Sequence, residues 1–232
     1  MNQNQDSFLQ KAYADKEQTY YDGSRPDMLS FIPASTRCLL DVGCGGGAFG
    51  AAVKSAIGCE VWGIEPELDA SNRAAARLDR VITGLFSEDA GLPSKHFDCI
   101  VFNDVLEHML DPAKALVYAK SLLQDGGTIV ASIPNIGHFP TIWRLAILGE
   151  WEYGERGILD KTHLRFFTRQ SIRTLFESSG YRLDRLEGIN DYCQLIPADR
   201  RLWRYYKFFS LLPGSGIRDM RYLQFGVRAT VK

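Results

Sequence analysis

Long apolar runs are missing from this sequence of 232 residues. No stretch of about 18 consecutive apolar residues occurs, so we expect no helix that spans a membrane. Residues 1–10 are polar and lack the apolar segment of a signal peptide. These two absences predict a cytoplasmic protein.

Cysteine is also scarce, and its positions form no pattern. The five cysteines contain no C-x-x-C pair and no spacing typical of metal ligands; they are Cys38, Cys44, Cys59, Cys99 and Cys193. A dispersed, odd-numbered set is typical of reduced thiols and not of a disulfide framework. We therefore expect no structural disulfides and no metal centre.

An excess of charge of either sign is the third absence. Lys and Arg number 27 against 28 Asp and Glu, which gives a formal net charge of -1. Proteins that bind nucleic acid usually carry a marked positive balance or a basic face. Bulk charge therefore does not favour a nucleic-acid partner, although a local basic patch would still be compatible with one.

What the chain does contain is a regular alternation of strand and helix signals. With 45% hydrophobic residues it can bury a substantial core. Short apolar runs alternate with helical patterns up to residue 134, which indicates βαβ units and a mostly parallel sheet. Seven strands are expected, at 37–42, 60–64, 80–83, 98–102, 128–133, 181–186 and 222–231. The main helices are expected at 48–57, 68–78, 112–123 and 168–179. The predicted fold is α/β and doubly wound, a Rossmann-like seven-stranded sheet.

A glycine-rich turn follows the first predicted strand. Residues 41–47 read Asp-Val-Gly-Cys-Gly-Gly-Gly, and glycines there allow a ligand to approach the backbone closely. Glu65 ends the second strand, where an acid can accept both hydroxyls of a ribose. Gly43, Gly45 and Ala48 also satisfy G-x-G-x-x-A, so an NAD-dependent oxidoreductase is an alternative. Asp41 favours the ammonium of an amino-acid ligand over a pyrophosphate.

Four blocks in this order resemble class I S-adenosylmethionine-dependent methyltransferases. They are LLDVGCGGG (39–47), VWGIEP (61–66), FDCIVFNDVLEHMLDP (97–112) and LLQDGGTIVASIPN (122–135). The resemblance implies S-adenosyl-L-methionine as cofactor. It implies that Asp41, Gly43 and Gly45 hold the methionine part, that Glu65 holds the ribose, and that Asn103 lies near the sulfonium. Relatives have an acid after the third strand for the adenine; here the candidates are Ser87, Glu88 and Asp89.

An alcohol acceptor must lose a proton, and a histidine near the cofactor can take it. His163 lies in a D-x-T-H-L-R-F-F stretch similar to ones in methyltransferases that modify sugars, lipids and other small metabolites. We predict His163 as base or orienting residue and His108 as the second candidate. His138 is a weaker one, and His96 is expected at the opposite end of the sheet. For each histidine a purely structural role is the alternative.

Two long connections leave the edge of the sheet where ligands bind. We expect one domain over 1–232, with an N-terminal cap (1–33), a cofactor-binding core (34–133) and helical lid insertions at 134–168 and 187–221, after strands 5 and 6. Within the cap, Tyr20, Tyr21 and Arg25 are candidates for a third wall. The aromatic and basic stretch 199–212 predicts a lid helix; alternatives are a peripheral membrane contact on anionic lipid and a stacking surface for single-stranded nucleic acid.

The predicted function is therefore methyl transfer to an oxygen of a small molecule such as a sugar, a lipid-linked glycan or a related metabolite. A non-catalytic protein that binds S-adenosylmethionine is the remaining alternative.

Overall fold

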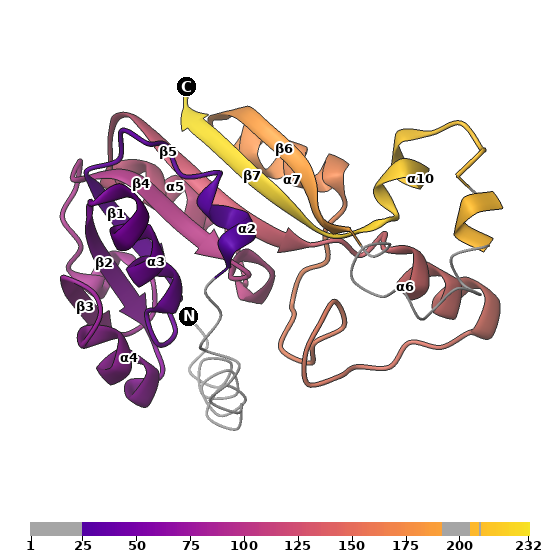
Figure 1. Ribbon diagram of the computed structural model, residues 1–232, viewed down its shortest axis with the longest axis horizontal. Coiled ribbons are helices and arrows are strands. Elements are labelled where there is room, and N and C mark those ends of the chain that lie inside the picture. Colours follow the sequence, from indigo (N-terminus) through magenta and orange to yellow (C-terminus); the bar gives the residue numbers. More distant parts are fainter. Residues whose placement is uncertain (1–24, 192–204, 209) are drawn as a thin grey trace.

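A computed structural model describes residues 25–191, 205–208 and 210–232. Their centre is a seven-stranded sheet in the order β3-β2-β1-β4-β5-β7-β6 (Figure 1). The strands are β1 (Cys38–Val42), β2 (Glu60–Glu65), β3 (Arg80–Thr83), β4 (Phe97–Asn103), β5 (Leu123–Pro134), β6 (Tyr181–Asp191) and β7 (Tyr222–Val231). The first five strands pair in parallel, and β7 runs antiparallel to both β5 and β6. The doubly wound, mostly parallel fold predicted from the sequence is confirmed.

Helices cover both faces of this sheet. The helical segments are α2 (Pro26–Leu29), α3 (Ala48–Ile57), α4 (Leu68–Ala75), η2 (Glu88–Ala90), η3 (Leu106–His108), α5 (Pro112–Leu122), α6 (Phe139–Trp143), η4 (Arg144–Leu148), α7 (Arg169–Ser178) and α10 (Ser215–Asp219). Helices α2 and α3 bury Met28 and Val53 against one face, while α5 and α7 bury Leu116 and Phe176 against the other. Each fully buried side chain of this size stabilises the fold by about 1.5–3 kcal/mol.

Several element ends differ from the prediction. Helix α4 ends at Ala75 instead of residue 78, because the chain turns there and Leu78 packs beside Gly47, Gly50 and Gly63. Strand β5 begins at Leu123, since Leu123 pairs with Phe97 across a bulge before the regular register starts. Strand β6 continues to Asp191, because β7 pairs with it along that length. Hydrogen bonds between strands, which a local pattern cannot reveal, set the two strand ends.

The carboxyl ends of β1, β2, β4 and β5 meet at one edge of the sheet, since these strands are parallel. Strand β7 is antiparallel to them, so its first residues lie at that same edge. Segments that follow the parallel strands and precede β7 therefore converge there.

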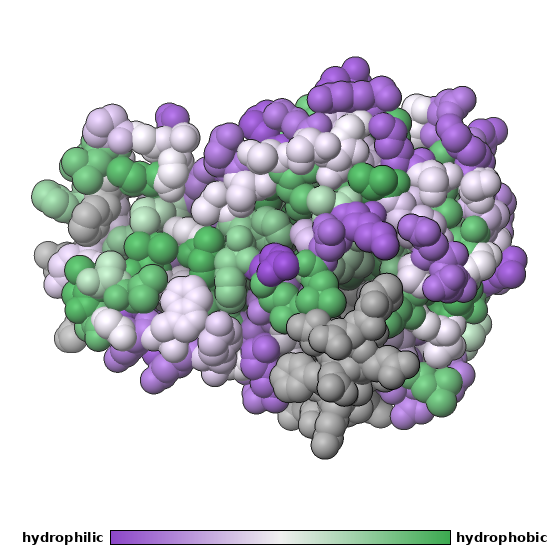
Figure 2. Space-filling view, turned by 180° about the vertical axis from the view of Figure 1, so that it is seen from behind, coloured by the Kyte–Doolittle hydropathy of each residue, from purple (hydrophilic) through white to green (hydrophobic). Residues whose placement is uncertain are grey.

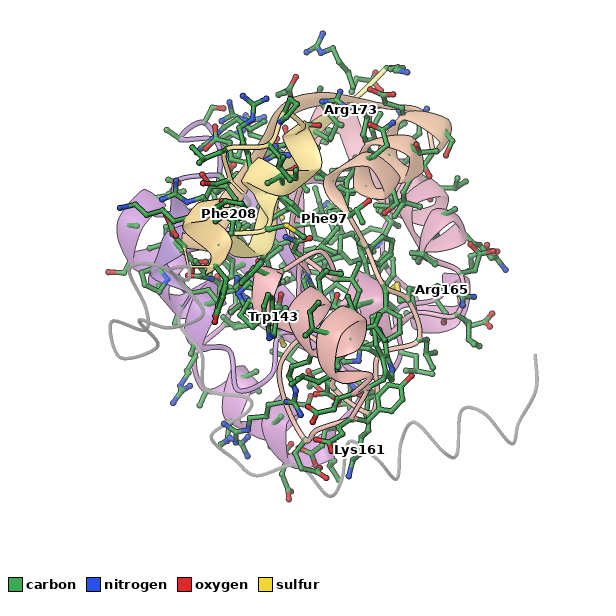
Figure 3. The ribbon with its side chains drawn as sticks, turned by 90° about the vertical axis from the view of Figure 1, so that its right-hand side faces the viewer. Phe97, Trp143, Lys161, Arg165, Arg173 and Phe208 are labelled. Atoms are coloured by element: carbon green, nitrogen blue, oxygen red, sulfur yellow. The ribbon has the colours of Figure 1, made fainter. Side chains whose placement is uncertain are left out.

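The predicted insertions pack on each other beside this edge. The ring of Trp143 in α6 stacks on Tyr205 with centroids 4.9 Å apart, and Phe139 contacts the buried Tyr206 at 5.5 Å. Trp143 and Phe208 accordingly lie on neighbouring segments of one side of the molecule (Figure 3). We call residues 139–148, 205–208 and 210–219 the aromatic lobe. Residues 199–204 and 209 of the predicted lid helix lie outside the described residues.

Within the described ranges, no helix has both the length and the apolar composition that crossing a membrane requires.

Candidate active site

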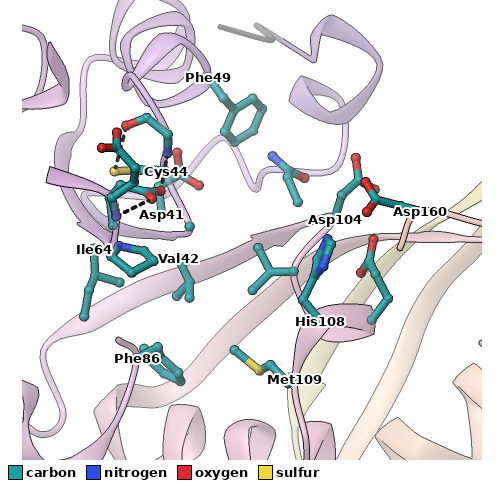
Figure 4. Close-up of a pocket in the computed structure, with 18 of the residues that line it drawn as sticks. Asp41, Val42, Cys44, Phe49, Ile64, Phe86, Asp104, His108, Met109 and Asp160 are labelled. Carbon is teal, nitrogen blue, oxygen red and sulfur yellow. Dashed lines mark hydrogen bonds between the residues drawn. The ribbon is translucent and has the colours of Figure 1, made fainter. Parts of the chain in front are cut away.

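A cavity of about 550 Å³ opens at the carboxyl edge of the sheet. This volume is within the range of sites that bind small molecules and cofactors. Its walls come from the ends of β1, β2 and β4, from the loop 157–163 and from the start of β7. Asp41 and Cys44 lie at one end, and Asp104, His108 and Asp160 lie at the other (Figure 4). We call these the cofactor end and the acceptor end.

Glycines shape the cofactor end through their backbone geometry. Gly43 and Gly45 have φ of 67° and 52°, a region that residues with a Cβ rarely adopt. The Gly43 N–H donates to the Ile64 carbonyl at 2.8 Å, which closes the turn against β2. A Cβ at Gly43 would lie 2.8 Å from a methyl carbon of Val105. The turn therefore needs glycine on both conformational and steric grounds.

Glu65 has a role in holding the fold that the sequence did not reveal. Its carboxylate accepts hydrogen bonds from the Gly45 N–H at 2.9 Å and from the Glu67 N–H at 3.0 Å. Burial raises the pKa of Glu65, and these two N–H groups act in the opposite direction. Each carboxylate oxygen has a further lone pair, so the same side chain can tie the two loops together and still accept ribose hydroxyls.

Asp41 and Asn103 present buried polar atoms at the cofactor end. Asp41 is 2% exposed, and burial together with the nearby Glu65 raises its pKa to about 8. Among the described residues, neither Oδ2 of Asp41 nor either amide atom of Asn103 has a hydrogen-bond partner. Buried polar atoms of this kind favour a ligand that supplies the missing partners. An ammonium group fits beside Asp41, whereas a pyrophosphate would meet two carboxylates there.

The third strand contributes a mostly apolar wall. Gly84, Leu85 and Phe86 line the cavity, and Phe86 packs edge-on against Phe102 with ring centroids 5.5 Å apart. The residues that line the cavity do not include Ser87, the predicted adenine contact, or its alternatives Glu88 and Asp89. They come later in the chain, at the start of η2 and within it. An adenine in this cavity would meet backbone and aromatic surface on this side.

The two predicted catalytic histidines are brought together at the acceptor end. His108 ends η3 and His163 lies in the loop before α7, and their ring centroids are 4.7 Å apart. Backbone bonds join the segments, because the N–H groups of Leu164 and Arg165 both donate to the Glu107 carbonyl, at 2.8 and 3.0 Å. Both histidines line the cavity.

Side chains and carbonyls fix the orientation of these rings. Nδ1 of His108 lies 3.1 Å from the Thr162 carbonyl, and Nδ1 of His163 lies 2.9 Å from the Ile158 carbonyl. The Thr162 hydroxyl donates to Asp160 at 2.7 Å, which braces the loop. The rings are therefore held in one arrangement at the cavity wall.

Glu107 completes the cluster, although it was not among the predicted catalytic residues. Its side chain is 1% exposed, and its Oε1 lies 3.9 Å from Nε2 of His163. Burial raises the pKa of Glu107 well above its ordinary value, and the negative charge of Asp104 adds to this. Its position directly before His108 in η3 was the available signal, but nothing in the sequence indicated that it would be buried.

Asp104 and Arg25 form a structural network at this end of the cavity. Asp104 adopts φ of 55°, unusual for a residue other than glycine, and accepts hydrogen bonds from Ser132 at 2.9 Å and from Gln224 at 2.8 Å. Its other oxygen pairs with Arg25. Arg25 lines the cavity as expected for the N-terminal cap, whereas Tyr20 and Tyr21 lie outside the described residues. The contribution of Gln224 from β7 was not predicted.

The other two histidines lie elsewhere. His96 precedes β4 at the far edge of the sheet and packs against Trp62, with centroids 5.1 Å apart. His138 is buried beside α6 and does not line the cavity; burial lowers its pKa to about 4. The insertion 134–168 contributes to the cavity lining through Pro134, Gly157, Ile158, Asp160 and His163. Among the described residues of 187–221, none does. Of the two predicted lid insertions, the first therefore supplies the cavity lining among the described residues.

Comparisons with known proteins agree with this geometry. A family model described as "Methyltransferase domain" matches residues 13–186. A ubiquinone biosynthesis O-methyltransferase of Cereibacter sphaeroides is 29% identical over 163 residues, which are 66% of this chain and 64% of the relative. The enzyme of the same name from Xanthomonas axonopodis pv. citri is 30% identical over 68% of this chain and 67% of its own length. The chain thus spans about two thirds of these relatives.

Solved structures show the same fold at low sequence identity. A SAM-dependent methyltransferase from Archaeoglobus fulgidus superposes with a TM-score of 0.65 at 17% identity, covering 97% of this chain and 99% of that one. A methyltransferase from Thermotoga maritima, titled a possible histamine N-methyltransferase, gives 0.63 at 19% identity, covering 99% and 96%. With the family match, the sheet order and the glycine turn in agreement, the chain belongs to the class I S-adenosyl-L-methionine-dependent methyltransferases.

Proposed function

We propose that this protein transfers the methyl group of S-adenosyl-L-methionine to a hydroxyl oxygen of a small molecule. One observation carries the proposal: a single cavity joins the glycine turn with Asp41 and Glu65 to the buried cluster of Glu107, His108 and His163. The relatives named O-methyltransferases support oxygen as the accepting atom.

The residues of the cofactor end would hold the donor by its polar groups. Asp41 would bind the ammonium, Glu65 would accept the ribose hydroxyls, and the amide of Asn103 would face the region of the sulfonium. The turn at Gly43 and Gly45 allows the backbone to approach the methionine part. When bound, the cofactor supplies a methyl group on a positively charged sulfur. Most of the rate enhancement is then expected from alignment of donor and acceptor.

The acceptor end would position the hydroxyl and remove its proton. The prediction that His163 or His108 serves as base fits the position of both rings at the cavity wall. Proton transfer to a positioned group of this kind contributes about 10²–10⁴ in rate. Asp104 is not a good candidate for this role, because Arg25, Ser132 and Gln224 already engage its carboxylate.

The aromatic lobe supports an acceptor with an apolar or lipid part. Its exposed apolar side chains include Ile147 (59%), Phe208 (72%) and Leu211 (81%). In Figure 2 the lobe, at the left of the view, carries a concentration of apolar surface. We propose that this lobe rests on a lipid surface, which agrees with the membrane contact that residues 199–212 predict. A lipid-linked molecule would then enter the cavity beside the lobe. A lipid-linked glycan is one acceptor of this kind.

A labelled-methyl screen tests the proposal. Purified protein, cofactor carrying a labelled methyl, and extract fractions of lipids, sugars, proteins and nucleic acids are incubated, and the labelled product is identified. We expect label on oxygen in the lipid or small-metabolite fraction, and less of it with Asp41→Asn when the cofactor is limiting. Cofactor binding by calorimetry without transfer to any fraction would favour the non-catalytic alternative. Absence of binding to the wild type would reject both.

A further inference from the structure

Three side chains of the acceptor end direct metal-ligand atoms to one point. One ligand atom from each of Glu107, His108 and His163 lies within 4.8 Å of the other two. The residues are 1%, 8% and 9% exposed, so this is not a surface cluster of acids. The group borders the cavity next to the position proposed for the acceptor.

The two imidazoles are oriented as metal ligands. A backbone carbonyl only accepts hydrogen bonds, so the bonds to the carbonyls of Thr162 and Ile158 place the ring hydrogen on Nδ1 of each neutral histidine. Nε2 of each ring then carries the lone pair. Histidines that bind metals usually make this second bond from the other ring nitrogen to a carbonyl or carboxylate.

Glu107 gives a second and independent indication. Neither carboxylate oxygen has a hydrogen-bond partner among the described residues, although the side chain is 1% exposed. The guanidinium of Arg25 is engaged by Asp27 and Asp104 and does not pair with it. A buried carboxylate without a partner is unfavourable unless it gains a proton or a cation.

We propose that Glu107, His108 and His163 bind a divalent first-row transition ion, and that this ion binds the acceptor oxygen. Two imidazole nitrogens and one carboxylate are a known ligand set of catalytic zinc sites and of 2-His-1-carboxylate iron sites, which leave open positions for substrate. Mg²⁺ prefers an all-oxygen shell, so we expect it to bind more weakly. The sequence analysis expected no metal centre, because two ligands adjacent in the chain and a third in a distant loop form no recognisable spacing.

The proposed role of the ion rests on the proposed function. An ion on the acceptor oxygen would make its hydroxyl more acidic, so that neither histidine has to act as base. The O–H bond breaks and its proton leaves to water. A C–O bond then forms as the carbon–sulfur bond breaks, and the electron pair of that bond remains on sulfur. The products are the methyl ether, the neutral thioether and one proton.

Metal titration of the chelator-treated protein tests the site itself. Calorimetry with Zn²⁺ and electron paramagnetic resonance with Mn²⁺ should each show one ion per chain. Glu107→Gln and His163→Ala should weaken binding at least tenfold, whereas His96→Gln and Asp41→Asn should bind as the wild type does. Binding of S-adenosylhomocysteine by the Glu107 and His163 variants checks that the cofactor end stays folded.

Two results would overturn the site: no Zn²⁺ or Mn²⁺ bound by the wild type, or wild-type metal affinity in folded Glu107→Gln and His163→Ala. If those variants do not fold, nitrogen couplings from Cu²⁺ bound to the wild type decide the matter, because imidazole ligands produce them and carboxylates do not. Absence of these couplings would reject the site.

Activity separates this inference from the proposed function. Methyl transfer that is lost on chelation and restored by Zn²⁺ or Mn²⁺ supports the role of the ion. Transfer that survives chelation refutes that role and leaves the proposed function intact. An ion that binds in a protein that methylates no acceptor refutes the proposed function and leaves the site intact.

Discussion

The cofactor end of the cavity is built from one continuous turn and the end of the neighbouring strand, whereas the acceptor end joins segments far apart in the sequence. Backbone N–H groups and glycines hold the first, through bonds such as Gly45 N–H to Glu65. Contacts between η3 and the loop before α7 hold the second. Substitutions at the two ends should therefore have different effects. Those at the cofactor end should change cofactor affinity, and those at the acceptor end should change turnover.

The largest effect is expected at the acceptor end. His163→Ala should lower turnover by about 10²–10⁴, because it removes an imidazole that acts on the acceptor hydroxyl directly or through the proposed ion. The affinity for S-adenosylhomocysteine, measured by calorimetry, should stay within about twofold. His96→Ala is the matched control and should keep full turnover. A His163→Ala protein that is unfolded by circular dichroism would show that the imidazole holds the loop together.

At the cofactor end, Glu65→Ala should weaken cofactor binding about 100-fold. The carboxylate ties Gly45 and Glu67 and is expected to accept ribose hydroxyls, and bonds to charged groups contribute about 1.5–3 kcal/mol each. Glu60→Ala, at the opposite end of the same strand, is the control. Equal affinities of the Glu65 variant and the wild type in calorimetry would contradict the assigned role.

Asp41→Asn should show opposite effects on binding and stability. The folded-state pKa of Asp41, about 8, lies above its ordinary value, so the unfolded chain ionises first and the ligand-free protein loses stability as pH rises from about 4 to about 8. Asparagine does not ionise, so the variant should melt at higher temperature than the wild type at pH 8, with a smaller gap at pH 5. Each unit by which the pKa differs between the folded and unfolded states corresponds to about 1.4 kcal/mol of stability. For a chain of this size, that is about 3 °C in melting temperature.

The same variant should bind the cofactor about tenfold more weakly at pH 8, because the carboxylate no longer faces the ammonium. Melting curves without ligand and calorimetry with it, both at pH 5 and pH 8, measure the two effects. A gap in melting temperature that is the same at pH 5 and pH 8 would mean that Asp41 is already ionised in the folded protein at pH 5.

The smallest effect on the fold is expected in the aromatic lobe. Leu211→Asp changes a side chain that is 81% exposed, so the melting temperature should stay within about 1 °C. Binding to vesicles that contain anionic lipid, measured by co-sedimentation, should fall several-fold. Val117→Asp, an exposed position of α5, is the control. Equal vesicle binding by both variants would reject the lipid-contact role of the lobe.

The sequence predicted what depends on neighbouring residues. The turn at 41–47 was identifiable because a run of glycines, an apolar stretch before them and an alanine-rich stretch after them lie within twenty residues. Glu65 was identifiable because it ends the next strand. The cavity wall after β3 was not identifiable: Leu85 and Phe86 line the cavity and Ser87 does not, because the course of the chain there depends on packing against Phe102.

By itself the sequence determined the parallel sheet, the glycine turn and the acids that face it, since strand propensity, glycine conformation and charge are properties of local segments. Tertiary structure alone decided that Glu107 is buried, that His108 and His163 lie ring to ring, and that Gln224 of β7 joins Asp104. The physical reason is that these contacts form between loops that follow different strands and converge at one edge of the sheet. Long-range packing determines how those loops are placed relative to each other.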